Sequence, residues 1–288
     1  MSESARKAAI EAVEELRKSR VVVISSSWRH DMRHDLGVDG ARAFVEVFEG
    51  LERPDILSLF VVTRGGHAHF ADQVIRTIRA TNTKVEVLVP TFCNGVATLL
   101  AMYASGVALH PHGGIGAYDC GPMVADAARL DHDLMDYVPA LGGVHYQQSD
   151  PYLPARLASG VRERKLAREL ALRICPDDEA IGGLSHATLG TSTGLGAAEL
   201  AAMGVDAEIV DEAVLWRLFC ELEDVLELRA APPPAYTESD LADEVEFEPA
   251  VQRTSAIIES SGSTLSFTID TGRPAPDTGE FVGQWNWG

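Results

Sequence analysis

The chain of 288 residues is poor in basic residues, in cysteine and in long hydrophobic runs. Lysine and arginine together number 24 against 43 aspartates and glutamates, so the formal net charge is -19 at pH 7. An acidic surface of this size repels phosphate backbones and anionic lipid. We therefore expect neither nucleic acid nor a membrane among the partners.

The cysteines and the N-terminus indicate the compartment. The four cysteines are widely spaced and form no CxxC pair, and the charged, helix-patterned N-terminus is not typical of a secretory or transit peptide. Both features predict a reduced, cytoplasmic protein. The most apolar stretch, residues 95–109, is too short to span a bilayer. We expect it to contain a buried helix.

Strand patterns and helix patterns alternate along most of the chain. Apolar runs of strand length lie at 21–26, 56–63 and 84–90, and helical patterns follow them at 40–51, 68–80 and 95–105. Each run is almost continuously apolar, which is typical of strands that are buried on both faces. The sequence therefore predicts an α/β fold of repeated β-α units around a mostly parallel sheet.

The chain divides into four parts. An amphipathic helix with an apolar stripe occupies residues 1–19, and the α/β domain spans 20–228. Residues 229–250 form an acidic, proline-rich segment that carries six acids, three consecutive prolines and, from residue 230 on, no base, which predicts an extended linker. In the C-terminal extension, 251–288, apolar and polar residues alternate on both sides of a Ser-Gly pair, and this predicts a β-hairpin.

Two turns at strand ends form the candidate site. The first contains Gly65 and Gly66 after the run 56–63, and the second is "PTFCNGVAT" at 90–98. In a parallel sheet, the carboxyl ends of neighbouring strands meet at one edge, where ligands bind. Glycines and a helix N-terminus expose backbone N–H groups there, which suits an oxyanion. We expect Gly65, Gly66 and Val96 to supply these donors.

These segments, in this order, resemble the Clp-fold serine peptidases, and most closely the serine dehydrogenase proteinase family, which is related to signal peptide peptidase A. "DILSLFVVTRGGHAHF" is similar to that family's strand and T-(R/P)-G-G turn. "KVEVLVPTFCNGVATLL" is similar to its V-x-V-x-V-P strand and S-A-G-T nucleophile turn, and "GLGAAELAAMGV" to its late helix. The resemblance implies a Clp/crotonase-like fold, a peptidase-type site without a cofactor, and a homo-oligomer.

The resemblance fails at the nucleophile. Aligned on Pro90 and Thr98, the family's catalytic serine falls on Gly95, which has no side chain to attack with. The family's later histidine-containing run falls near residues 191–193, which read TST. The resemblance thus implies that the backbone of the turn was retained while its catalytic residues were lost. We expect a scaffold, regulatory or peptide-binding subunit, whose partner is a peptide or an active paralogue.

An active hydrolase is one alternative. Cys93 lies two positions before Gly95, and a thiolate near a helix N-terminus can act as a nucleophile. Lys165 or His186 would then serve as the base. The simpler interpretations are a cysteine packed in the turn, a lysine on a solvated helix face and a structural histidine.

A crotonase-like enzyme acting on acyl thioesters is the second alternative. It would use the Gly65/Gly66 oxyanion pocket together with a positioned carboxylate, for which Asp119 is the best candidate. Because one fold hosts unrelated functions, the fold alone does not decide between these activities.

The histidines suggest a metal site only weakly. His30 and His34 have helical ligand spacing, but no third and fourth ligand follow nearby. We therefore expect no metal and interpret this segment as a polar loop that covers the cleft or meets a neighbouring subunit. Two more pairs flank the proposed site, where they would either line the cleft or, as we expect, pack behind it: His67/His69 and His110/His112.

Overall fold

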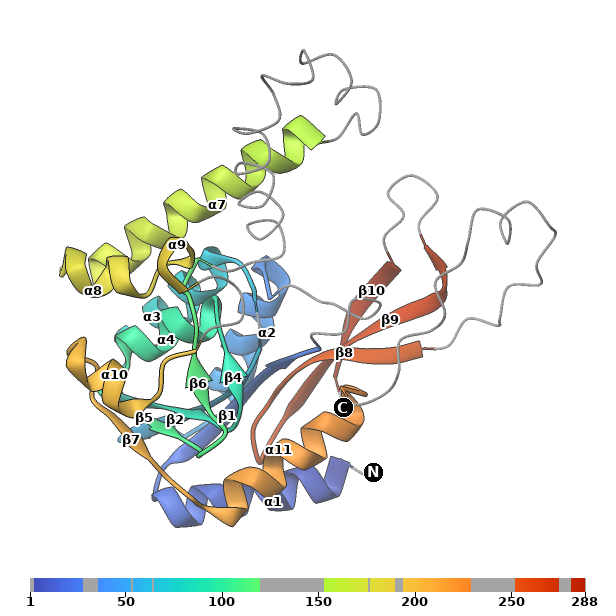
Figure 1. Cartoon of the computed structure of the whole chain (residues 1–288). Coiled ribbons are helices and arrows are strands. Elements are labelled where there is room, and N and C mark those ends of the chain that lie inside the picture. Colours follow the sequence, from blue (N-terminus) through green and yellow to red (C-terminus); the bar gives the residue numbers. More distant parts are fainter. Residues whose placement is uncertain are drawn as a thin grey trace.

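The computed structural model describes residues 3–27, 36–52, 54–63, 65–119, 153–175, 177–189, 194–228, 252–274 and 281–287. Its main sheet has eight strands in the order β10-β9-β8-β1-β2-β3-β5-β7 (Figure 1). These strands are β1 (Arg20–Ser26), β2 (Ile56–Val62), β3 (Lys84–Val89), β5 (Gly106–Leu109), β7 (Ala207–Ile209), β8 (Gln252–Glu259), β9 (Thr264–Pro274) and β10 (Phe281–Trp287). The five strands from β1 to β7 run parallel, and β8, β9 and β10 add antiparallel pairs. The predicted α/β fold with a mostly parallel sheet is confirmed.

Helices cover both faces of this sheet. One face carries α2 (Val38–Glu49), α3 (Ala68–Arg79) and α4 (Val96–Tyr103), with α7 (Leu153–Ile174) packed on α3 and α4. The other face carries α1 (Glu3–Arg17) and α11 (Ala213–Val225) (Figure 1). The shorter helices are α8 (Asp178–Gly183), α9 (His186–Leu189) and α10 (Ala197–Ala202). Within the described residues, no helix is long and apolar enough to cross a bilayer.

Strand alternation explains the unbroken apolar runs. Along β1, Val22 and Ile24 belong to the core that also holds Phe44 of α2, whereas Val21 and Val23 belong to the other core. Successive strand residues point to opposite faces, so a strand that is covered on both faces needs apolar residues at every position.

The order of the strands explains the placement of the helices. From β1 through β2 and β3 to β5, each new strand is added on the same side of the previous one. Crossovers between parallel strands are almost always right-handed, so connections that run in one direction place their helices on one face. The carboxyl ends of β2 and β3 are therefore neighbours, and the turns that follow them meet.

The N-terminal helix has a partner within the chain. Ile10 and Val13 of α1 are fully buried in a core that they share with Leu215 and Leu218 of α11. An apolar stripe without a partner in its own chain would be an argument for a homo-oligomer. The structure removes that argument, and the homo-oligomer stays a prediction.

The C-terminal strands continue the main sheet. The predicted hairpin is confirmed as β8 and β9, and β8 also pairs antiparallel with β1, for example through Ile258 and Ile24. A buried ion pair between Arg6 of α1 and Glu259 of β8, 2.9 Å long, joins this extension to the opposite layer of helices. The predicted acidic linker, residues 229–250, lies outside the described residues, as do His30 and His34.

Candidate functional site

A pair of short strands, which the sequence did not reveal, holds the turn before α4. These are β4 (Phe92–Cys93) and β6 (Gly114–Ile115), paired in parallel. The Gly95 N–H donates to the Ala117 carbonyl (2.7 Å), and the Gly116 N–H donates to the Cys93 carbonyl (2.7 Å). The Thr98 hydroxyl also donates to the Gly116 carbonyl (2.9 Å). The main chain of the turn is therefore fixed from both sides.

Gly95 occupies a strained position at the start of α4. Its backbone has φ 61° and ψ -116°, directly before the first helical residue. A residue with a side chain pays about 1–3 kcal/mol for such a conformation, whereas glycine adopts it readily. Nucleophile turns are sharp, strained strand-to-helix connections of this kind. Gly95 thus has a backbone conformation that suits a sharp strand-to-helix turn, and it has no side chain.

The two predicted turns meet at Gly66 and Val96. Gly66 has φ 112°, and a Cβ placed on it would lie 2.5 Å from Val96 Cγ2. Of the three predicted donors, the Gly65 N–H is directed to the Thr63 hydroxyl at 3.4 Å. Among the described residues, the N–H groups of Gly66 and Val96 donate to no acceptor. Two backbone donors are thus available beside Gly95.

Cys93 is placed as a packing residue. Its side chain is fully buried, and its thiol donates to the Val61 carbonyl at 3.2 Å. A substrate cannot reach a thiol in that position without opening the core. The neighbouring Asn94 is also buried, and within the part of the chain described its Oδ1 accepts no hydrogen bond.

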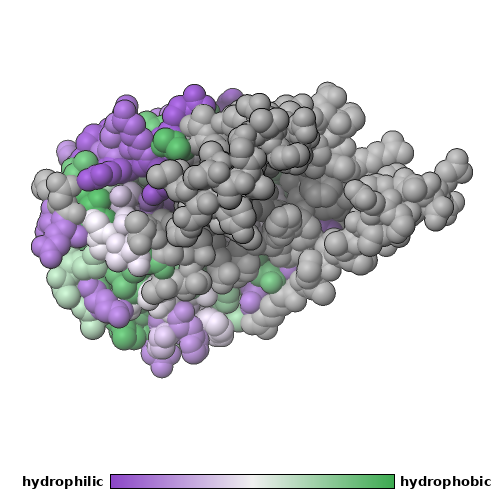
Figure 2. Space-filling model, turned by 45° about the horizontal axis from the view of Figure 1, so that its top comes forward, coloured by the Kyte–Doolittle hydropathy of each residue, from purple (hydrophilic) through white to green (hydrophobic). Residues whose placement is uncertain are grey.

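Lys165, the predicted base whose side chain the structure describes, does not lie at the turn. Lys165 lies on α7 with its side chain 77% exposed, and its ammonium is 3.9 Å from Glu169 on the same helix. Figure 2, with the α7 side turned forward, shows a largely hydrophilic described surface with smaller hydrophobic patches between. His186 is the first residue of α9, but its side chain lies outside the described residues, as does the run 191–193.

A glutamate that the sequence did not single out lies beside the glycine turn. Glu163 of α7 accepts a hydrogen bond from the Ala68 N–H (2.6 Å), and its carboxylate is 3.4 Å from His67 Nδ1. Burial opposes ionisation of Glu163, but hydrogen bonds from His67 and Ala68 outweigh it and lower the pKa of this carboxyl. Glu163 is therefore a carboxylate that caps α3 two residues after Gly66.

Asp119, the candidate carboxylate of a crotonase-like enzyme, is buried and lies 3.7 Å from Arg164 of α7. Burial, followed by the nearby Asp119 charge, raises the pKa of the adjacent Tyr118 to about 12. At neutral pH the Tyr118 hydroxyl keeps its proton, so it is not a base. The Asp119 carboxylate forms an ion pair with Arg164 of α7.

His110 packs away from the turn. It is buried and stacks on Trp216 of α11, with ring centroids 4.9 Å apart, on the face of the sheet opposite α4. Burial and the neighbouring His112 lower the pKa of His110, against the opposing effect of Asp211. Within the described residues, no group of three or more histidine, cysteine or acidic side chains could hold a metal ion.

Comparison with known proteins shows a distant structural similarity and no family. No known protein family matches the chain, and no curated protein matches it. Among solved structures, a mutant of ClpP1 from Listeria monocytogenes is 12% identical, with 71% of this chain and 99% of that chain covered and a TM-score of 0.37. A similarity this low carries no argument about activity. Membership of the serine dehydrogenase proteinase family stays a prediction.

Proposed function

We propose that this chain is a catalytically degenerate relative of the Clp-fold serine peptidases that binds a peptide at the Gly95 turn without cleaving it. It then acts as a scaffold or regulatory subunit. The observation that carries this proposal is the conformation of Gly95, with φ 61° and ψ -116° at the position where the resemblance puts the nucleophile. The strained backbone remains although the side chain that would use it is absent.

The polar groups around the turn favour a peptide as the ligand. The N–H groups of Gly66 and Val96 are donors directed to no acceptor in the described chain, so they suit a carbonyl oxygen. Asn94 Oδ1 is an acceptor without a donor in the same part of the chain. A peptide group supplies one acceptor and one donor side by side, and a buried polar group gains most from being paired.

Removal of one backbone donor tests this proposal. Val96 is the first residue of α4, where proline is tolerated because its N–H is not needed by the helix. Val96→Pro deletes the donor, and Val96→Ala removes a similar part of the side chain but keeps the N–H. The assay measures fluorescence polarisation of a labelled random decapeptide library, with thermal melts to show that each variant is folded.

We expect the wild type and Val96→Ala to bind the peptide library, and Val96→Pro to lose about tenfold or more in affinity, as for the loss of a buried hydrogen bond. Equal binding by the two variants would show that this amide is not used. A wild-type protein that binds no peptide would overturn the peptide-binding function.

A further inference from the structure

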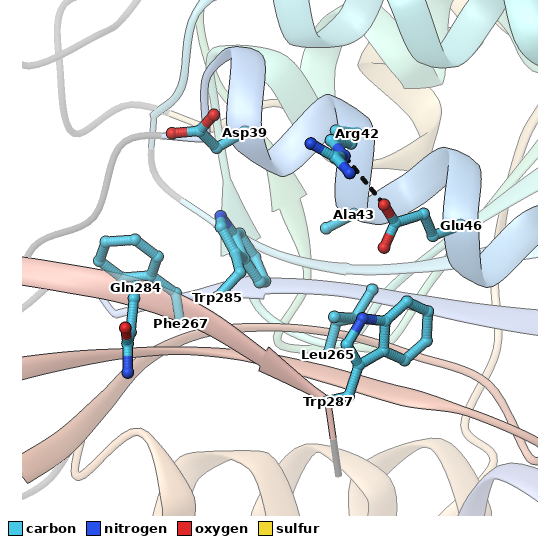
Figure 3. Close-up of a pocket in the computed structure, with 9 residues that line it drawn as sticks. All are labelled: Asp39, Arg42, Ala43, Glu46, Leu265, Phe267, Gln284, Trp285 and Trp287. Atoms are coloured by element: carbon cyan, nitrogen blue, oxygen red, sulfur yellow. Dashed lines mark hydrogen bonds and ion pairs between the residues drawn. The ribbon is translucent and has the colours of Figure 1, made fainter.

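A pocket that shares no lining residue with the Gly95 turn lies between α2 and the C-terminal strands β9 and β10 (Figure 3). Its volume is about 410 Å³, which is sufficient for a small organic group. No part of the function proposed above uses it.

Two tryptophans of β10 line this pocket. Trp285 and Trp287 are two residues apart on one strand, so their side chains lie on the same face of the sheet, towards α2 (Figure 3). Trp285 lies opposite Phe267 of β9 in the strand pairing, and the two rings meet edge to face with centroids 5.6 Å apart. Trp287 is 61% exposed. The lower side of the pocket is therefore aromatic and accessible.

Charged side chains of α2 form the opposite side. The Arg42 guanidinium donates to the Glu46 carboxylate at 2.9 Å, so these two charges largely cancel (Figure 3). Asp39, two turns before Glu46 on the same helix, is exposed and forms no ion pair within the described residues. Among the described residues, the pocket thus combines aromatic rings with one carboxylate that has no partner of opposite charge.

We propose that this pocket binds an organic cation, with a substituted ammonium group held between the tryptophans and Asp39. The face of a tryptophan ring carries negative electrostatic potential and attracts ammonium groups, most strongly when they are alkylated and weakly hydrated. The Asp39 carboxylate adds a direct attraction. The chain's net charge of -19 raises the local concentration of cations and disfavours an anionic ligand.

The pocket and the Gly95 turn are separate, so each can be tested without the other. The turn follows the parallel strands β2 and β3, whereas the pocket is built on β9 and β10 at the antiparallel edge of the sheet (Figure 1). Failure of peptide binding at the turn would leave the cation pocket unaffected, and the reverse also holds.

Isothermal titration of the full chain with choline chloride tests the proposal. The matched control ligand is 3,3-dimethyl-1-butanol, which has the same shape and no charge. A second arm uses a blocked trimethyl-lysine amide, so that a cation carried by a protein can be distinguished from a free small molecule. We expect choline to bind at millimolar concentrations or below, and the neutral isostere to bind at least about threefold more weakly.

Variants locate the binding. Trp287→Ala removes the exposed ring, and Asp39→Asn removes the uncompensated charge at constant shape. Each should weaken choline binding about 2-fold to 30-fold. Glu49→Gln is the control, because Glu49 also lies on α2 and is exposed but does not line the pocket, and it should leave binding unchanged. Tighter binding of the trimethyl-lysine amide than of choline would support a protein-borne cation as the ligand.

Four results would overturn the proposal. Equal affinity for choline and its neutral isostere would mean a merely apolar pocket. Binding that survives Trp287→Ala would place the cation elsewhere, and stronger binding of maltose than of choline would identify a carbohydrate site. Absence of any choline binding by the folded wild type would also refute it.

Discussion

The Gly95 turn and the pocket between α2 and β10 are specified in different ways. The turn is held by main-chain hydrogen bonds as short as 2.7 Å, and its neighbours Cys93 and Thr98 are fully buried. The pocket is formed by side chains, several of them exposed. A backbone framework can keep its shape after its reactive side chain is gone, whereas a pocket built from side chains has only the chemistry they present. The proposed roles follow this difference: the turn is proposed to keep a backbone without its reactive side chain, and the pocket is proposed to bind through the side chains that line it.

The largest effect is expected at the buried ion pair that joins the C-terminal strands, on which the pocket is built, to α1. Arg6 and Glu259 form an ion pair with side chains 8% and 0% exposed. Arg6→Ala leaves a buried carboxylate without its cation, which costs about 3–5 kcal/mol of unfolding free energy. Urea denaturation measures this loss. The control is Lys7→Ala, which breaks the exposed Lys7–Glu3 pair and should cost about 0.5 kcal/mol or less; equal losses would show that the buried pair does not join the layers.

The next effect tests how firmly the backbone of the turn is fixed. Gly66→Ala puts a Cβ 2.5 Å from Val96 Cγ2 at a residue with φ 112°. Backbone strain and overpacking together should cost about 2–4 kcal/mol in urea unfolding. Gly106→Ala, whose new Cβ would have no atom within 4 Å, should change stability by less than about 1 kcal/mol. A Gly66→Ala protein as stable as this control would contradict the tight approach of the two turns.

A smaller, pH-dependent effect tests the contact of α7 with the turn. The pKa of Glu163 is lowered from 4.5 in the folded protein, so its ionised form stabilises the fold. This contribution is complete above pH 4.5 and is lost as the pH falls through the lower folded-state value. The stability difference between wild type and Glu163→Gln should therefore be largest at neutral pH and shrink in acid.

Urea titrations across this range measure that difference. Glu169→Gln is the control, since Glu169 lies on the same helix with its side chain 55% exposed. It should show no comparable pH dependence. If the Glu163→Gln difference stayed constant in acid, the contact between Glu163 and the start of α3 would not be made in solution.

The sequence predicted the parallel half of the fold well. Its strands are buried on both faces, so each appears as a continuous apolar run, and glycines mark the turns that follow β2 and β3. Gly95 lies in one of these turns, and its positive φ explains why a residue without a Cβ stands there. Local patterns suffice where burial and backbone geometry decide the structure.

The remaining features depend on pairings between distant residues. The contact of Glu163 with Ala68 joins residues 95 positions apart, and the run around Glu163 has the composition of a solvated helix face. The pairing of β8 with β1 joins the two ends of the chain, and β4 and β6 have only two residues each. No local periodicity marks such contacts. The aromatic pocket was missed for the same reason, because Asp39 and Trp287 come from opposite ends of the sequence.

We propose that the turn before α4 retains the backbone conformation of a nucleophile turn but lacks the catalytic side chain. Introducing a serine at Gly95 tests this proposal most directly. Gly95→Ser and the control Gly95→Ala are each treated with a fluorophosphonate probe and assayed for peptide and ester hydrolysis, after thermal melts show that they are folded. A general base contributes about 10²-fold to 10⁴-fold to such catalysis, and the described structure brings none of the predicted bases to the turn. We predict that Gly95→Ser is unlabelled and hydrolyses substrates no faster than Gly95→Ala. Stoichiometric labelling at the new serine, with turnover that the probe inhibits, would contradict the account and show that a working base survives beside the turn.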